Sequence, residues 1–319
     1  MLASIGIKGT STAAYSLKSL KLKFDETIDN TQHTIIMPSK HLPNHHFNKI
    51  KKISLRNSGN DFHGSFIKDI SYTQLAIDMG LDLELTYNRD VEVFVNSNFY
   101  GLMHLRTEKS DGAISNLLQV KKKDVNIIKI NHLGDGQEEI EFKDGDKEIL
   151  QNLVDQVQSG NTAELLQLID INSFMDYIAY ENFIGNSDWP FNNVQLYSVA
   201  DGRFRFFLYD LDFAGTRDLF FAEDHNKQGF LYHMYQALMQ DPEFSQKLIQ
   251  RNKEIYHKAT YENFEAIIND NANRIENEIV YNISKYQVPS SRVVWYYEIE
   301  KVLNQFQSRR SAYAKHYNL

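Results

Sequence analysis

Three side chains that can bind a cation or accept a proton stand at the two open ends of a predicted β-hairpin. Asp188 lies five residues before Asn193, and Asp210 directly follows the hairpin. Carboxylate and amide oxygens are the ligands that hard divalent cations prefer in proteins. A carboxylate beside such a cation can also accept a proton from a substrate hydroxyl group. The three residues therefore predict a metal site with an adjacent base.

The hairpin is predicted from two apolar runs, residues 194–199 and 204–209, which are joined across Asp201-Gly202. An Asp-Gly dipeptide between apolar runs is a strong signal for a two-residue hairpin loop. With that loop Asn193 faces Asp210, and the Cβ atoms of directly opposed residues lie about 4.5–5.5 Å apart. We therefore expect Asn193 and Asp210 to share one cation.

The spacing of these residues is also that of a phosphoryl-transfer centre. In protein kinases an Asp-x-x-x-x-Asn segment, a hairpin and a further Asp orient the attacking hydroxyl group and bind the metal ions on the phosphates. The triplets His-Arg-Asp and Asp-Phe-Gly of ordinary protein kinases are absent, which excludes that class. Asp and Asn are also common turn residues, so a purely structural interpretation stays open.

A turn of small residues near the N-terminus, which includes Gly9, Thr10 and Ser11, precedes a predicted strand over residues 18–24. Backbone N–H groups in such a turn can approach a phosphate group. Lys18 shares one face of the predicted strand with apolar side chains, and a lysine facing inward requires a partner or a cleft. Lys18 is therefore either a lysine that binds the nucleotide phosphates or a strand-end lysine with a buried stem.

The elements that must position these residues differ between the two halves of the chain. Up to about residue 130 apolar residues alternate as in strands, with a hairpin over residues 91–105 and one helix over residues 66–79. After about residue 146 the helical period dominates. Helices are predicted over residues 149–157, 174–183 and most of 230–316, with a break near 287–291. The tract 131–147, rich in glycine and charge, is predicted to be a lobe boundary or a mobile loop.

These patterns predict an α+β protein with a β-rich N-terminal lobe (about 1–130) and a mostly helical C-terminal lobe (about 131–319) that carries one hairpin. The absence of cysteine excludes disulfides, thiol nucleophiles and zinc–cysteine sites. The formal net charge of −8 argues against a nucleic-acid partner. No apolar run approaches the ~20 residues of a membrane span, and residues 1–9 do not resemble a signal peptide.

Five short motifs, in this order, resemble the spore coat protein H (CotH) kinase family of atypical kinases over nearly the whole chain. They are Lys8-Gly-Thr-Ser-Thr12 with the strand that follows it, Leu55-Arg-Asn-Ser-Gly-Asn-Asp61, the hairpin that ends in Glu108, Asn186-Ser-Asp188 with Asn193, and Tyr209-Asp-Leu-Asp-Phe-Ala-Gly215. The resemblance implies a two-lobed, atypical protein-kinase-like fold. It also implies transfer of the γ-phosphoryl group of ATP to Ser or Thr of a protein substrate, with Mg²⁺ or Mn²⁺.

The resemblance assigns a role to each site residue. Asp188 becomes the catalytic residue, and Asn193 and Asp210 become the metal ligands. The nucleotide-binding residues would be Lys18, Gly9, Thr10, Ser11 and Glu108, and the segment after Asp212, up to residue 226, would take the place of an activation segment. A spore coat, cell-surface or secreted location is also implied by the family.

The chain departs from the family pattern at three places. Lys8 replaces an Arg, Tyr209 replaces a Trp, and Ile67 stands where an Arg is common, unless Lys68 substitutes for it. No predicted metal ligand is lost. Two alternatives stay open: a non-catalytic spore-coat or cell-surface protein that keeps the fold as a scaffold, and a metal-dependent glycosyl- or phosphate-transfer enzyme that uses Asp210-Leu-Asp212 as an Asp-x-Asp pair.

Overall fold

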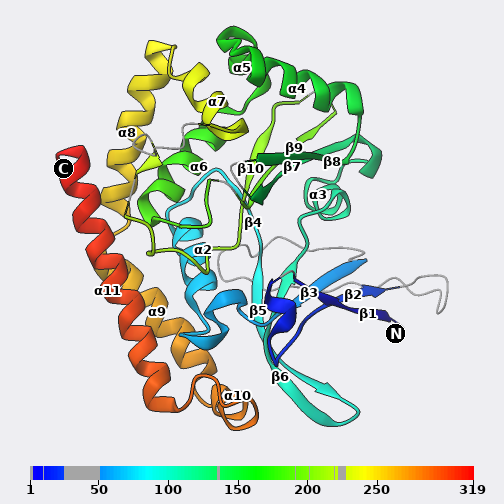
Figure 1. Ribbon diagram of the computed structural model, residues 1–319, viewed down its shortest axis with the longest axis vertical. Coiled ribbons are helices and arrows are strands. Elements are labelled where there is room, and N and C mark those ends of the chain that lie inside the picture. The colour runs from blue at the N-terminus through cyan, green and yellow to red at the C-terminus, as the bar shows by residue number, and fades with distance from the viewer. Residues whose placement is uncertain are drawn as a thin grey trace.

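The computed structural model describes residues 3–9, 11–24, 51–134, 137–190, 192–200, 202–218, 220–221 and 228–319. Within these ranges the chain forms two five-stranded sheets surrounded by helices, in agreement with the predicted α+β class (Figure 1). In this view the first sheet lies in the lower part of the molecule and the second sheet lies above the first.

The first sheet is antiparallel and has the order β1-β2-β3-β6-β5. Its strands are β1 (Ala3–Lys8), β2 (Ser19–Phe24), β3 (Lys52–Arg56), β5 (Asn88–Val95) and β6 (Asn98–Thr107). The predicted hairpin over residues 91–105 is confirmed as β5 and β6. Its turn residues Asn96 and Ser97 both have positive φ angles, 49° and 64°, as a tight two-residue turn requires.

Helix α2 (Lys68–Asp78) confirms the helix predicted over residues 66–79. It begins where the Lys68 N–H donates to the Asp61 carboxylate at 2.9 Å, and it packs against α9 (Tyr261–Ile275). The short 3₁₀ turns of the described chain are η1 (Ser11–Ala14), η2 (Gly59–His63) and η3 (Lys122–Asp124).

The second sheet has the order β4-β10-β9-β7-β8. Its strands are β4 (Glu84–Leu85), β7 (Val125–Gly134), β8 (Gln137–Asp144), β9 (Val194–Val199) and β10 (Arg205–Leu208). The prediction of a mobile loop at 131–147 is wrong, because β7 and β8 form a hairpin there; the division into lobes near residue 130 stays a prediction. Ile140 and Phe142 alternate with exposed charged residues, so the period-two strand pattern was present but was masked by glycine and charge.

The expectation of only one strand pair in the second half is wrong for the same reason. The β9–β10 hairpin is the centre of a mixed sheet, with β7 next to β9 and the short β4 parallel to β10. The ends of β9 and β10 are therefore held from both sides.

Helix α6 (Ile171–Ile184) is the central helix, and every residue over 173–184 is buried. The other helices are α3 (Asp111–Leu118), α4 (Lys147–Ser159), α5 (Thr162–Leu168), α7 (Phe230–Leu238), α8 (Pro242–Lys258), α10 (Ile279–Tyr286) and α11 (Arg292–Tyr317). Gly160 ends α4 and the break at 287–291 separates α10 from α11, as predicted. Helix α11 runs along one side of the molecule and packs against α6, α8 and α9 (Figure 1). Within the described ranges, no helix is long and apolar enough to cross a membrane.

Candidate active site

The β9–β10 hairpin forms, but in a register one residue away from the predicted one. Arg205 pairs with Tyr197 and Phe206 pairs with Leu196, so continuing the register sets Asn193 level with Tyr209. The predicted direct opposition of Asn193 and Asp210 is therefore wrong.

The physical reason for the different register is a longer connection. Ala200 already has a positive φ of 52°, and the Gly202 N–H donates to the Val199 carbonyl at 2.9 Å. The chain therefore begins to turn one residue earlier than a two-residue Asp-Gly loop would require. Asp201 itself lies outside the described residues.

Asn193 and Asp210 share an unusual backbone conformation just outside the strands. Their φ angles are 63° and 64°, in the left-handed region that few residues other than glycine occupy. Such conformations cost free energy and are concentrated at functional sites. Both predicted metal ligands thus stand at positions where the chain is bent out of the regular strand geometry.

The structure brings Asp188 and Asn193 together. Asn193 Nδ2 donates to Asp188 Oδ2 at 2.7 Å, and Asn192 Nδ2 donates to Asp188 Oδ1 at 2.9 Å. The Asp188 N–H in turn donates to the Asn186 side chain at 3.2 Å. The Asp188 carboxylate is therefore fixed from two sides, and the Asn193 amide keeps Oδ1 as the atom a cation would take.

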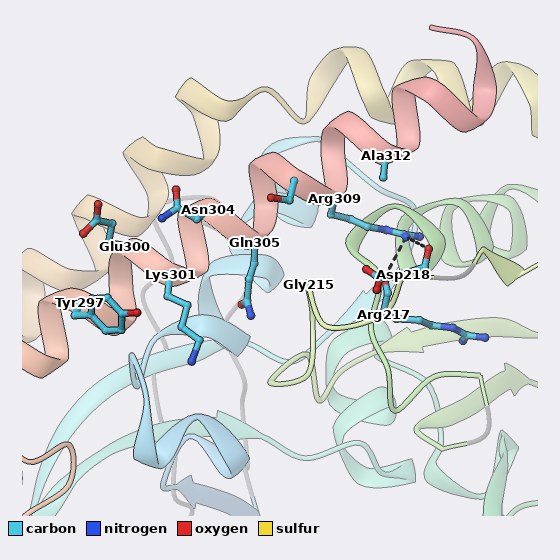
Figure 2. Close-up of a pocket in the computed structure, with 11 residues that line it drawn as sticks. Gly215, Arg217, Asp218, Tyr297, Glu300, Lys301, Asn304, Gln305, Arg309 and Ala312 are labelled. Atoms are coloured by element: carbon cyan, nitrogen blue, oxygen red, sulfur yellow. Dashed lines mark hydrogen bonds between the residues drawn. The ribbon is translucent and has the colours of Figure 1, made fainter.

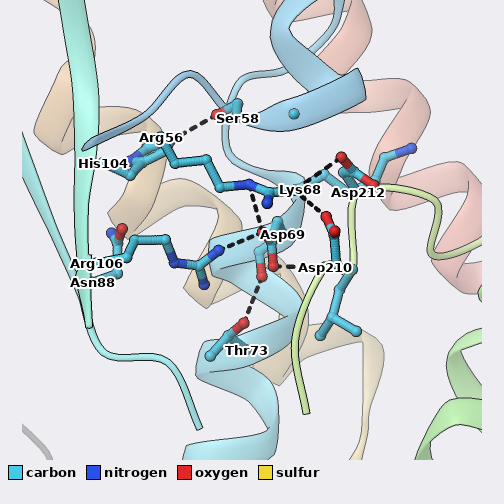
Figure 3. A network of polar contacts seen from close by, with 12 residues as sticks. Arg56, Ser58, Lys68, Asp69, Thr73, Asn88, His104, Arg106, Asp210 and Asp212 are labelled. Atoms are coloured by element: carbon cyan, nitrogen blue, oxygen red, sulfur yellow. Dashed lines mark hydrogen bonds and ion pairs between the residues drawn. The ribbon is translucent and has the colours of Figure 1, made fainter. Parts of the chain in front are cut away.

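One arginine, Arg56, contacts the carboxylates of both Asp210 and Asp212. Arg56 was not predicted as a site residue. Arg56 Nη2 hydrogen-bonds to Asp210 Oδ1 and lies 3.2 Å from Asp212 Oδ2 (Figure 3). The Asp212 side chain is only 2% exposed, compared with 28% for Asp210. Two carboxylate oxygens thus converge on one cationic nitrogen.

The turn before α2 closes over the Asp212 carboxylate. The Asn60 N–H donates to Asp212 Oδ2 at 2.7 Å. Gly59 has φ +63°, and a Cβ atom at this position would overlap both Asp212 Oδ2 and Arg56 Nη2. The chain can pass this close to the carboxylate only with glycine here.

Asp69 on α2 ties this cluster to the core. It forms an ion pair with Arg106, lies 3.5 Å from Arg56 Nε, and accepts a hydrogen bond from the Leu211 N–H at 3.2 Å (Figure 3). The segment that carries Asp210 is therefore anchored directly to helix α2.

The electrostatics of the cluster follow from its charges. Burial and the neighbouring Asp210 raise the pKa of Asp212 to about 7. Burial opposes the charge on Arg56, but the carboxylates of Asp210, Asp69 and Asp212 outweigh it and raise its pKa. Burial acts against ionised Asp69 as well, yet Arg106 and Arg56 lower its pKa to about 2.

The sequence offered a signal for some of these residues. Asp212 was named only in the alternative that uses Asp210-Leu-Asp212 as an Asp-x-Asp pair, and Arg56 lies in the motif over 55–61 but was not predicted as a site residue. Asp69 carried no signal, because a lone carboxylate in a helix is usually a surface residue.

In the first sheet it is Lys8, and not Lys18, that contacts Glu108. Lys8 Nζ lies 2.8 Å from Glu108 Oε1 and 2.5 Å from Ser54 Oγ. Burial alone would raise the pKa of Glu108, but the Lys8 ammonium lowers it to about 2.

Lys18 is not brought into this cluster. Its Nζ donates to the Ala13 carbonyl at 2.7 Å, and it precedes β2 instead of lying within it. Gly9 follows Lys8 at the end of β1. Thr10 and the Ser11 side chain lie outside the described residues, so the nucleotide role of the 9–11 turn, like that of Lys18, stays a prediction.

Lys109 is close enough to both the Lys8–Glu108 pair and the Asp210–Arg56 pair for their charges to act on its ammonium group. Its ammonium group lies 3.8 Å from the centre of the Tyr209 ring, one residue before Asp210. Burial, assisted by the charges of Lys8 and Arg56 and opposed by Asp210, lowers the pKa of Lys109 to about 7. A lysine stripped of water beside the carboxylates is suited to an anionic ligand.

The donor chemistry of the site fits a hard cation. Asp210 and Asp212 offer carboxylate oxygens around one point and Asn193 offers an amide oxygen, all ligands typical of Mg²⁺. Within the part of the chain that the structure describes, no group of three or more His, Cys, Asp or Glu side chains is arranged to hold a metal ion. An oxygen-rich substrate such as a polyphosphate would complete the coordination.

Comparison with known families gives a match over nearly the whole chain. The family model described as "CotH kinase protein" matches residues 5–314. No curated protein matches the chain. The match of the family model confirms the resemblance that was drawn from the five sequence motifs.

Proposed function

The chain belongs to the CotH kinase family, and from this premise we propose that it transfers the γ-phosphoryl group of ATP to Ser or Thr hydroxyl groups of a protein substrate, with Mg²⁺ or Mn²⁺. Family membership supports a kinase-like enzyme. The nucleotide, the metal and the acceptor class are our proposal.

One observation carries the proposal: the carboxylates of Asp210 and Asp212 converge on Arg56 Nη2. A position where two carboxylate oxygens contact one cationic nitrogen can also bind a divalent cation. Asp210, Asp212 and Asn193 would hold the metal, and the metal would supply charge neutralisation on the β- and γ-phosphates.

The remaining roles follow from position. Asp188, fixed by Asn192 and Asn193, would accept the proton of the attacking hydroxyl group. Lys8, held by Glu108, and Lys109 would bind the phosphate oxygens. Such a centre works mainly by positioning reactants and offsetting charge, since phosphoryl transfer asks for little covalent chemistry from the protein.

A hollow of about 340 Å³ beside Glu108 suits the nucleoside part of ATP. It is lined by the end of β6, by α3 and the residues before it, and by the start of β3, including Thr107, Ser110, Gly112, Asn116 and Lys52. Its volume falls in the range of roughly 300–1,000 Å³ that is usual for small-molecule sites. This supports placing the base between the first sheet and α3 and the phosphates toward Lys8 and Lys109.

The experiment that tests the proposal is a transfer assay with ATP labelled on the γ-phosphate. The protein is incubated with Mn²⁺ or Mg²⁺, with and without a Ser-rich basic acceptor, and Asp188→Asn serves as the control. Label on Ser or Thr of the acceptor or of the protein itself is the expected result. No transfer from the wild-type protein under any of these conditions would favour the scaffold alternative.

A second candidate is favoured by the same carboxylate pair. Asp210 and Asp212 also form the Asp-x-Asp arrangement of metal-dependent glycosyl- or phosphate-transfer enzymes. That function predicts binding of a nucleotide sugar and no protein phosphorylation. Calorimetric titration with ATP and with a nucleotide sugar, each with Mn²⁺, separates the two.

A further inference from the structure

The segment after Asp212 is fastened onto the loop that carries Asp188. The Gly215 N–H donates to the Ile184 carbonyl at 2.7 Å, and the Arg217 N–H donates to the Gly185 carbonyl at 2.9 Å. The Thr216 hydroxyl lies 2.7 Å from the Ser187 hydroxyl. Residues 213–218 therefore lie directly against the chain between α6 and Asp188.

Arg309 on α11 secures this contact from behind. Its Nη1 donates to the Arg217 and Asp218 carbonyls at 3.1 and 2.9 Å. Its Nε and Nη2 donate to the Phe183 and Asn182 carbonyls at 3.2 and 2.6 Å. Four of the five guanidinium donors are thus used on backbone carbonyls from two separate segments. Figure 2 shows the two contacts with Arg217 and Asp218.

The chemistry of this contact is unusual for an arginine. Residue 309 is 6% exposed, and its acceptors are carbonyls instead of a carboxylate. Two of them belong to the last turn of α6, the negative end of the helix dipole. The guanidinium also lies 4.1 Å from the centre of the Phe220 ring. Only a planar fork of donors can reach four carbonyls in this way, so lysine is not an equivalent replacement.

The close approach at Gly185 shows how tightly these pieces fit. Gly185 has φ +59°, and a Cβ atom there would lie 2.8 Å from both Arg309 Nε and the Arg217 carbonyl oxygen. The end of α6, the 213–218 segment and α11 meet at this glycine.

The sequence of the segment adds an independent observation. Between Asp212 and Gly229 the chain contains one residue with a hydroxyl group, Thr216. Its hydroxyl already contacts Ser187 and donates to the Phe213 carbonyl. Kinases that require activation order this segment by pairing a phosphorylated side chain with arginine.

We propose that Arg309 is a positioning residue that fixes residues 213–218 against the Asp188 loop in the unmodified chain, so that phosphoryl transfer needs no prior phosphorylation of this segment. The activity part rests on the proposed function; the positioning part does not. In this chain one buried arginine, directed at backbone carbonyls, takes the place of a phosphate-dependent contact.

The test compares Arg309→Met and Arg309→Lys with Arg310→Met. Arg310 is a matched control, because it is the next residue on α11, donates to one carbonyl, that of Ala259, at 3.1 Å, and stacks on Tyr256 at 4.1 Å. Hydrogen exchange of the Gly215 and Arg217 amides, kcat at saturating ATP and the Kd for ATP are measured for each protein.

We expect both Arg309 variants to exchange these two amides at least tenfold faster and to lose about 10–100-fold in kcat, with little change in ATP affinity. Arg310→Met should keep wild-type exchange and kcat. Unchanged exchange in the Arg309 variants would overturn the positioning role. If Arg309→Met does not fold, Arg309→Lys, which keeps the charge, carries the comparison.

The second half of the proposal is tested on the wild-type protein after phosphatase treatment, with mass spectrometry to verify that residues 212–229 carry no phosphate. Full initial rate without a lag is expected. A lag, or a rate that recovers only as Thr216 becomes phosphorylated, would overturn it. If no phosphoryl transfer is detected at all, the proposed function fails, while the exchange experiment still decides the role of Arg309.

Discussion

The ammonium group of Lys8 lies 2.8 Å from the Glu108 carboxylate, although the two residues are 100 positions apart in the chain. They come from β1 and from the end of β6, and Ser54 on β3 contacts both. Protein kinases also use a Lys–Glu ion pair to hold the lysine that contacts the nucleotide phosphates, although their glutamate lies on a helix.

Lys8→Ala is expected to weaken ATP binding more than Lys18→Ala does. A desolvated lysine–phosphate contact contributes roughly 1.5–3 kcal/mol, which is about a 10–150-fold change in Kd. Lys18 donates to a backbone carbonyl, so its removal should change Kd much less. Calorimetric titration of both variants with ATP and Mn²⁺ decides between the two lysines, and the reverse ranking would return the phosphate contact to Lys18.

Asp188→Asn should retain ATP and metal binding but lose about 10²–10⁴-fold in the rate of phosphoryl transfer, the usual contribution of a general base. The variant can no longer accept from both the Asn192 and Asn193 amides. Single-turnover kinetics and a metal titration check this. Loss of metal affinity in place of kcat would make Asp188 a ligand.

Asp210→Asn should abolish most metal-dependent activity with little loss of stability. Arg56 pairs with Asp210 and offsets its charge. The cluster nevertheless contains three carboxylates and two guanidinium groups, so removing one negative charge leaves it balanced. We expect the free energy of unfolding to change by less than about 1 kcal/mol.

Asp69→Asn is the matched comparison for that variant. Asp69 and Arg106 are almost fully buried, 4% and 5% exposed, and breaking a buried pair by removing one partner costs about 3–5 kcal/mol. Chemical denaturation of both variants tests the contrast. Equal destabilisation would mean that Asp210 is as much a structural residue as Asp69.

Local patterns predicted the elements of this chain better than its long-range contacts. The Asn96-Ser97 turn, helix α2 and the end of α4 at Gly160 follow from nearby residues. The β9–β10 register failed because a single extra loop residue moves every pair. The Lys8 partner of Glu108 could not be predicted from the sequence, because Lys8 ends β1 and Glu108 follows β6, two strands that β2 and β3 separate in the sheet.

The same reasoning explains which site residues were found. Asp188 and Asn193 are five residues apart, so their contact is local and spacing predicts it. The contact of Arg56 with Asp210 spans 154 positions and depends on how the turn at Gly59 meets the end of β10. Tertiary packing, not sequence spacing, determines whether Arg56 and Asp210 come into contact.

A buried glutamate near Asp188 should make the stability of the protein depend on pH. Glu181 is 1% exposed, and neither carboxylate oxygen has a hydrogen-bond partner among the described residues. Burial, with a smaller contribution from Asp188, raises the pKa of Glu181 to about 8. The folded protein therefore keeps this carboxyl group protonated at pH values where the unfolded chain ionises it.

The direction in which stability changes with pH follows from how many protons Glu181 binds in the folded and in the unfolded state. Between about pH 4.5 and pH 8 the folded state binds more protons at Glu181 than the unfolded state, so the free energy of unfolding falls as pH rises. Glu84, whose pKa burial also raises to about 8, adds to the same slope. Glu181→Gln keeps the shape without the ionisation, and should gain roughly 2–4 kcal/mol relative to the wild type between pH 5 and pH 8. Denaturation curves at both pH values measure this, with Glu84→Gln removing the other part of the slope. A variant whose stability falls with pH as steeply as the wild type would show that Glu181 is already ionised in the fold.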